Sequence, residues 1–168
     1  MNTNRLAAEE EELLVLPPGR GRTLVISPRG TQLVFKARGE RAGAAFALAE
    51  LTAEPHWAGP VPHVHRRHEE LWYVLEGEFE FLLGEERVHA GPGTFVRVPP
   101  GLVHAPSNAL GSRSRLIMTL SPPDFEGYFH ETAAAAERIR SGETTDEIEA
   151  LKTEIRARYD TYEVTGIS

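Results

Sequence analysis

The chain has 168 residues and a mass of 18.6 kDa, which suits one domain with a hydrophobic core and is too short for two of ordinary size. It carries 25 acidic and 18 basic residues, for a formal charge of -7, so neither a nucleic-acid-binding surface nor docking on an anionic membrane is expected. Cysteine is absent, which excludes disulfides, thiolate metal sites and cysteine nucleophiles. Metal binding or catalysis would therefore depend on histidine, carboxylate and hydroxyl groups.

The N-terminus has no cationic start leading into an apolar stretch, so no secretory signal is visible. Four glutamates, Glu9 to Glu12, follow the first residues instead. No apolar run approaches the roughly 20 residues needed to cross a bilayer. We therefore expect a cytoplasmic protein in which residues 1–12 form an acidic, solvated tail.

Short extended segments separated by Gly and Pro run as far as Ser121, which predicts one β domain over residues 13–121. Turn signals recur about every ten residues, a spacing typical of a sandwich or barrel. The clearest hairpin lies around Gly77, where apolar and acidic residues alternate. The expected strands cover residues 23–27, 31–37, 45–53, 71–75, 78–83, 94–98 and 115–120.

The composition changes after Ser121, and residues 122–168 are expected to form helices that pack on the β domain. A pair of prolines suits a helix start, and an alanine run at 133–136 has high helix propensity, which predicts a helix over 124–140. A second helix is indicated by apolar residues three and four positions apart. These residues are Ile148, Leu151, Ile155 and Tyr159.

Two stretches place histidines and a glutamate where they can converge. His63 and His65 are two residues apart, so on a strand both rings leave the same face. Glu70 opens the next extended run, and a proline-glycine corner delivers His104 onto another short strand. Three neutral imidazoles and one carboxylate suit Fe, Mn, Co, Ni or Zn. A six-coordinate metal would leave positions open for water, substrate or oxygen.

These two stretches resemble the two sequence motifs of the cupins. The first motif, His-x-His, four residues, Glu, six residues, Gly, fits from His63 to Gly77, although Gly59 stands closer to the first histidine than the family's leading glycine does. The second motif fits at every position, at Gly93, Pro99, Gly101, His104 and Asn108. The resemblance implies a mainly β, double-stranded β-helix (jelly-roll) barrel with a C-terminal helical segment. It also implies one divalent transition metal per chain, held by His63, His65, Glu70 and His104.

Within the cupins, the whole sequence is similar to small single-domain proteins described as quercetin-dioxygenase-like. The similar sequence segments include His-Val-His-Arg-Arg at 63–67 and Ser-Pro-Pro-Asp-Phe-Glu-Gly-Tyr-Phe at 121–129. In such relatives the metal binds a flavonol-like oxygen donor and the glutamate can act as a base. True flavonol dioxygenases often have two barrels, whereas this chain has one motif pair, so the specific substrate does not carry over.

We therefore expect a mononuclear metal-dependent dioxygenase acting on a small enolisable or aromatic, flavonol-like substrate. Fe or Mn is the favoured metal and Ni, Co or Zn the alternatives, and Glu70 would ligate the metal or move the substrate proton. Two other functions stay open, a metal-dependent isomerase or lyase that works without oxygen and a non-catalytic small-molecule-binding cupin. Strand alternation turns four apolar residues inward, where those nearest the metal would line a substrate pocket and the others fill the barrel. They are Trp72, Val74, Phe79 and Phe81.

The other four histidines lie outside the motif spacing and are interpreted as surface or loop residues. They are His56, His68, His89 and His130, of which His68 borders the predicted site. Tyr73 and Leu75 face outward and need cover from another layer, from the C-terminal helices or from a second subunit. Because cupin barrels commonly pair, a homodimer is expected. A small-molecule substrate is the other expected partner, with no nucleic acid and no membrane.

Overall fold

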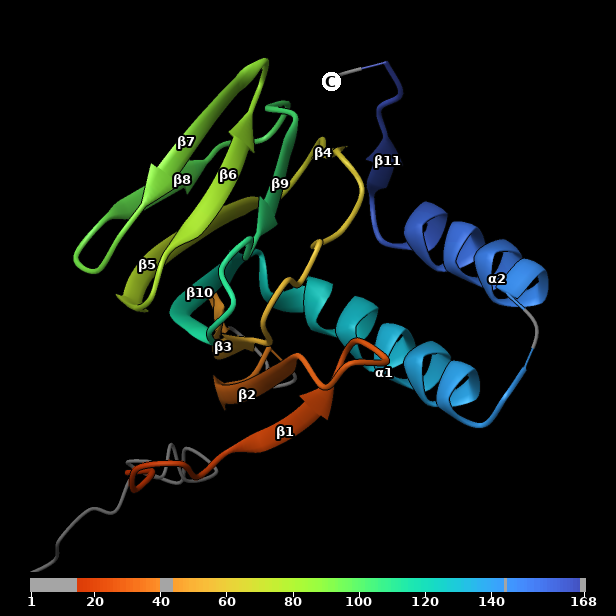
Figure 1. The fold of residues 1–168 in the computed structure, drawn as a ribbon, viewed down its shortest axis with the longest axis horizontal. Coiled ribbons are helices and arrows are strands. Elements are labelled where there is room, and N and C mark those ends of the chain that lie inside the picture. The colour runs from red at the N-terminus through yellow and green to blue at the C-terminus, as the bar shows by residue number, and fades with distance from the viewer. Residues whose placement is uncertain (1–14, 40–43, 144, 167–168) are drawn as a thin grey trace, which may run out of the picture.

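The computed structural model describes residues 15–39, 44–143 and 145–166. The acidic tail expected at 1–12 lies outside the described residues. Two antiparallel sheets face each other, and a pair of helices lies beside them (Figure 1). Neither helix in the described part of the chain has the length and apolar character that a membrane crossing requires.

The larger sheet has six strands, and the smaller sheet has five. In spatial order the larger sheet consists of β1 (Arg22–Val25), β2 (Gln32–Ala37), β3 (Ala47–Ala53), β10 (Ser114–Ser121), β5 (Glu69–Glu76) and β8 (Phe95–Val98). The smaller sheet consists of β11 (Thr161–Glu163), β4 (His63–His65), β9 (His104–Ser107), β6 (Phe79–Leu83) and β7 (Glu86–Ala90).

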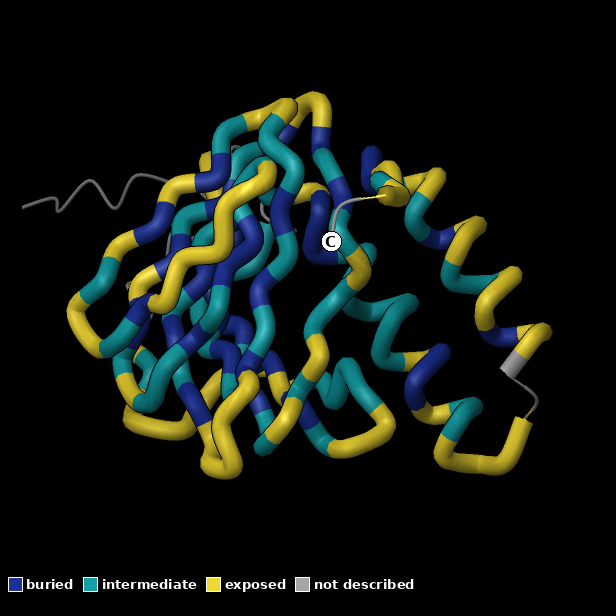
Figure 2. Tube along the Cα trace, turned by 45° about the horizontal axis from the view of Figure 1, so that its top comes forward, coloured by how far each residue is buried: buried dark blue, intermediate teal, exposed yellow. Residues whose placement is uncertain are grey.

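The hydrophobic core fills the space between the two sheets. Burial alternates residue by residue along β3 and β10, as expected when one face of a strand packs against a second layer. Figure 2 shows this alternation of buried and intermediate residues, in dark blue and teal, along strands of the sheets. Among the largest fully buried side chains are Leu33, Phe35, Phe79, Phe81, Leu116 and Leu120. The predicted fold class, a mainly β jelly-roll with C-terminal helices, is confirmed.

Two helices follow the last long strand. After the short 3-10 turn η1 (Pro123–Phe125), α1 covers Glu126–Arg140 and α2 covers Thr145–Arg158. Of the stripe predicted for the second helix, Ile148 and Ile155 are fully buried and form a small cluster with Ala135 of α1. The chain then returns to the smaller sheet, because β11 pairs with β4. Sequence patterns did not predict this last strand.

The first residue of α1 ties the helix pair to the larger sheet. The carboxylate of Glu126 is buried and accepts hydrogen bonds from Arg38 Nε at 2.8 Å and from the backbone N–H of Gly39 at 3.0 Å. His130, one turn further along the helix, lies 3.2 Å from the same carboxylate. An acidic group is also favoured at this end of a helix by the helix dipole. The helices therefore start from a fixed point at the end of β2.

Candidate functional site

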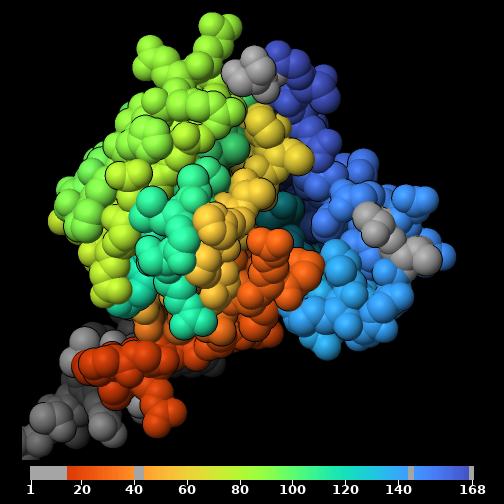
Figure 3. Space-filling model, viewed as in Figure 1, coloured from red at the N-terminus to blue at the C-terminus, as the bar shows by residue number. Residues whose placement is uncertain are grey.

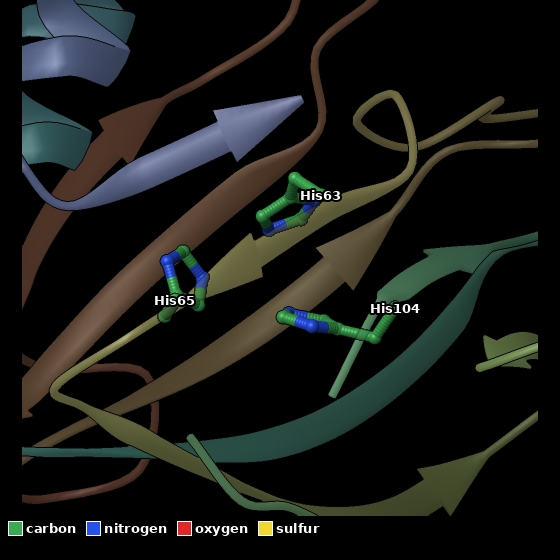
Figure 4. A group of neighbouring side chains, drawn as sticks. All are labelled: His63, His65 and His104. Atoms are coloured by element: carbon green, nitrogen blue, oxygen red, sulfur yellow. The ribbon is translucent and has the colours of Figure 1, made fainter. Parts of the chain in front are cut away.

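Three of the predicted site residues come from adjacent strands of the smaller sheet. His63 and His65 are the two ends of β4 and project from the same face, as strand alternation requires. His104 begins β9 and pairs with His63 across the two strands. One ring nitrogen from each histidine lies within 4.8 Å of the others, and Figure 4 shows the three rings grouped together.

Each of these three imidazoles is held in place through its Nδ1 atom. The Nδ1 atoms of His63, His65 and His104 lie 2.8, 3.1 and 3.1 Å from the backbone carbonyls of Val61, Asp160 and Leu102. A carbonyl can only accept a hydrogen bond, so Nδ1 is the nitrogen that carries the proton whenever one of these rings is neutral. The lone pair is therefore on Nε2, the nitrogen through which such a ring can bind a metal.

The fourth predicted residue, Glu70, reaches the cluster from β5 in the opposite sheet. One of its oxygens lies 3.5 Å from His65 Nε2 and the other lies 3.6 Å from His104 Nε2. Both of these Nε2 atoms are buried and have no hydrogen-bond partner among the described residues. Burial by itself raises the pKa of Glu70, but its contacts with His104 and His65 outweigh burial and hold that pKa well below its ordinary value. Glu70 is thus a carboxylate.

His63 is neutral at physiological pH. Burial is the main reason that its pKa falls to about 3, and the nearby His104 and His65 lower it further. A neutral imidazole is the form that binds a metal. The donor set of three imidazoles and one carboxylate could hold a divalent transition metal once the rings are unprotonated. The Nε2 atoms of His65 and His104, which have no hydrogen-bond partner in the described part of the chain, fit that interpretation, since such buried groups are costly to leave unsatisfied.

His68 lies in the loop between β4 and β5, in agreement with its interpretation as a surface or loop residue, but it is buried and not at the surface. It is only 5% exposed. Its ring stacks on His65 with centroids 3.8 Å apart and contacts Phe125 in a tilted arrangement at 4.1 Å. Burial is the main cause that lowers its pKa to about 4. A second group of candidate donors within 4.8 Å of one another consists of His65, His68 and Glu70. His68 is buried because η1 lies over it.

The remaining three histidines lie away from this cluster. His56 and His89 are exposed, which agrees with their interpretation as surface residues. His130 is half-buried on α1, where it contacts Glu126.

The turn between β4 and β5 is fixed by Asp160, a residue that sequence patterns did not single out. Its carboxylate accepts hydrogen bonds from the backbone N–H groups of Arg66 and Arg67 at 2.9 and 2.8 Å. Asp160 is 7% exposed and has a positive φ of 52°, a conformation that Asp tolerates better than most residues. It directly precedes β11, so the C-terminal strand and the histidine strand are held together at this point.

A cavity of about 640 Å³ opens onto the cluster from the side of the helices. Glu70 and His63 line its inner end, together with Trp72 and Met118. Of the four predicted pocket residues, only Trp72 is part of this lining. Val74, Phe79 and Phe81 are at most 1% exposed and fill the core between the sheets. Two of them lie far along their strands, since Val74 is four residues beyond Glu70 and Phe79 is four residues before Leu83, the partner of His104.

Comparison with known proteins gives one family match. Residues 49–120 match the family model for the cupin domain, a range that contains every residue of the cluster. Quercetin 2,3-dioxygenase from Bacillus subtilis is 34% identical over 70 residues, which cover 41% of this chain and 20% of that protein. The chain thus matches about a fifth of the length of this relative.

Solved structures with the same fold include KdgF from Halomonas sp. and the polyketide cyclase RemF from Streptomyces resistomycificus. KdgF is 24% identical with a TM-score of 0.57, and the match covers 65% of this chain and 93% of that one. RemF is 22% identical with a TM-score of 0.57, covering 67% and 83%. At these identities the likeness extends to the fold alone.

Proposed function

We propose that this protein is a cupin in which His63, His65, His104 and Glu70 bind one divalent transition metal, and that it is a metal-dependent dioxygenase. The match of residues 49–120 to the cupin domain supports this proposal. The observation that carries the proposal is the common orientation of the three rings. Each donates its Nδ1 proton to a backbone carbonyl, which leaves three Nε2 lone pairs beside a buried carboxylate.

The chemistry of the site follows from the residues around the cavity. A metal held there would act as a Lewis acid toward an enolate or phenolate oxygen, and iron or manganese would add redox chemistry with oxygen. Glu70, ionised and at the inner end of the cavity, is placed to accept the proton of an enol or phenol hydroxyl. Trp72, Met118 and Phe125 give this end apolar walls, which exclude water and suit an aromatic ring.

The proposed dioxygenase activity is tested by measuring oxygen uptake with a panel of flavonols and other enolisable aromatics, after the protein has been loaded with Fe, Mn, Ni or Co. We expect uptake by the wild-type protein above the metal blank and a loss of at least about 100-fold in Glu70→Gln. Glu69→Gln is the matched control, because Glu69 is the neighbouring residue and pairs with Arg97 outside the site. No uptake with any metal and substrate would contradict the dioxygenase, as would zinc as the native ion.

A metal-dependent isomerase or lyase is the second candidate, and Glu70 is the observation that favours it. A buried carboxylate beside the cavity serves proton transfer equally well without oxygen. The same substrates incubated under argon separate the two functions. Turnover under argon supports the isomerase or lyase, whereas turnover that requires oxygen supports the dioxygenase. Metal binding with an unaltered ligand under both conditions would instead indicate a binding protein.

A homodimer is part of the same proposal. Tyr73 and Phe95 pair across β5 and β8 on the outer face of the larger sheet and are 45% and 58% exposed. Two neighbouring exposed aromatic side chains are a feature that a subunit contact would cover. Light scattering on the wild-type protein and on Phe95→Ser tests this, with a dimer expected for the first and a monomer for the second. A monomeric wild-type protein would contradict it.

A further inference from the structure

The cavity extends well beyond the metal-site residues, along the whole of α1. One face of the helix lines it, through residues spaced three or four apart from Phe125 and Tyr128 to Ala136 and Ile139. Since α1 has 15 residues, this wall is about 22 Å long. Figure 3 shows the surface hollowed between the yellow segment near residue 60 and the blue helices. The space is therefore elongated.

The two ends of this groove can be placed along α1. At the start of the helix Phe125 contacts His65 and His68, with ring centroids 4.9 and 4.1 Å apart. At its end Arg140 Nη1 donates a hydrogen bond to the carbonyl of Ser27 over 3.1 Å. Arg29 lies in the turn that begins at Ser27 and also lines the cavity. The metal-site residues and Arg29 are thus at opposite ends.

One cation, Arg29 at the outer end, is available for a ligand. Three cations line the cavity, and two of them have acidic partners. Lys152 pairs with Glu149 at 2.7 Å and Arg156 with Glu163 at 2.5 Å. Arg29 is exposed, and the described part of the chain gives it no acidic partner. A negatively charged group at this end of a ligand would meet an unpaired guanidinium.

The middle of the groove favours aromatic surface. Beyond the inner end, the rings of Trp57, Tyr128 and Phe129 line the groove and can stack on a flat apolar ligand. A volume of about 640 Å³ is in the range of sites that enclose one small organic molecule. The groove is therefore matched in length, polarity and shape to a single class of ligand.

We propose that the groove binds an extended aromatic anion, with its oxygen donor at Glu70 and His63 and its carboxylate or other acidic group at Arg29. This inference deepens the proposed function, because it assigns the substrate class of the same site. A compact neutral aromatic molecule would fill only the inner part of the groove and would leave Arg29 without a partner.

The test uses two probes that differ in one group, anilinonaphthalene sulfonate and its uncharged counterpart N-phenylnaphthylamine. Both of the two tryptophans of the chain line the cavity, so quenching of their fluorescence by energy transfer reports occupancy of the groove. Wild-type protein is expected to bind both probes and to bind the sulfonate more tightly. Arg29→Gln should weaken the sulfonate about fivefold and leave the neutral probe unchanged.

Arg20→Gln is the matched control, because Arg20 is exposed, carries the same charge and does not line the cavity. It should bind both probes like the wild type. Equal weakening of sulfonate binding in both variants would show that the net charge of the protein, and not a contact with Arg29, attracts the sulfonate. That result would overturn the role of Arg29. Absence of quenching with either probe would overturn the groove as a ligand site. Neither result depends on the metal, whose content is measured separately, so failure here is distinct from failure of the proposed function.

Discussion

The Nδ1 atom of His65 donates a hydrogen bond to the backbone carbonyl of Asp160 over 3.1 Å, although 95 residues separate them in the chain. This bond joins the histidine strand to the segment that follows the last helix. Thr161 of the same segment lies 3.4 Å from the same nitrogen. The orientation of a candidate metal ligand thus depends on the C-terminal strand.

Loss of the Asp160 carboxylate is expected to weaken metal binding. In Asp160→Gly the positive φ is still tolerated, but the backbone N–H groups of Arg66 and Arg67 lose their acceptor. The turn between His65 and Glu70 then loosens, and metal affinity falls by about tenfold. Competition with a chelator measures this. Asp160→Asn, which keeps an acceptor oxygen and tolerates the same φ, should stay close to wild type, and equal affinity in all three proteins would contradict the role.

The depressed pKa of Glu126 predicts a pH-dependent contribution to stability. Burial raises this pKa, but Arg38, His130 and the N–H of Gly39 outweigh it, so the folded value lies below the ordinary 4.5. A group with a lowered folded pKa stabilises the protein above its unfolded pKa and stops doing so as pH falls through the folded value. At neutral pH Glu126→Gln should be less stable by about 1.5 kcal/mol.

Urea unfolding of both proteins at several pH values checks this. The difference in free energy of unfolding should be largest near neutrality and should shrink as the pH falls below 4.5. A difference that stays constant across this range would mean that the charge of Glu126 contributes nothing.

Gly59 is expected to tolerate no side chain. Its φ is +76°, and an added Cβ would lie 1.8 Å from the carbonyl oxygen of Pro106, on the strand that begins with His104. Gly59→Ala should therefore cost about 3 kcal/mol or more in unfolding free energy. Gly19→Ala separates the two causes, since Gly19 has a similar φ of +73° with nothing within 4 Å. That control should lose about 1 kcal/mol, and equal losses in both variants would show that the close approach is unimportant.

The sequence foresaw those parts of the site that depend on local spacing. His63 and His65 share a face because strand alternation requires it, and the corner before His104 brings a third ring to the adjacent strand. The rhythm of strands and turns predicted a sandwich or barrel, and the resemblance to the two cupin motifs implied the jelly-roll. The prediction that Glu70 joins these rings agrees with its distances of 3.5 and 3.6 Å from two of them.

Contacts between distant segments could not be foreseen. Asp160 carries no sequence signal, because its partners in the histidine segment lie more than 90 residues away. His68 is buried only because η1 lies over it, which no local pattern indicates. Alternation placed Val74 and Phe81 inward correctly, but it could not tell which inward residues face the cavity and which fill the core.

Elemental analysis of protein purified without added metal is the decisive measurement for the proposed metal site. We expect one Fe or Mn ion per wild-type chain and a large loss of metal in His104→Ala, because His104 supplies one of three converging nitrogens. His89→Ala, which changes an exposed histidine outside the site, should retain the wild-type content. A wild-type protein without bound metal, or His104→Ala with a full complement, would contradict it.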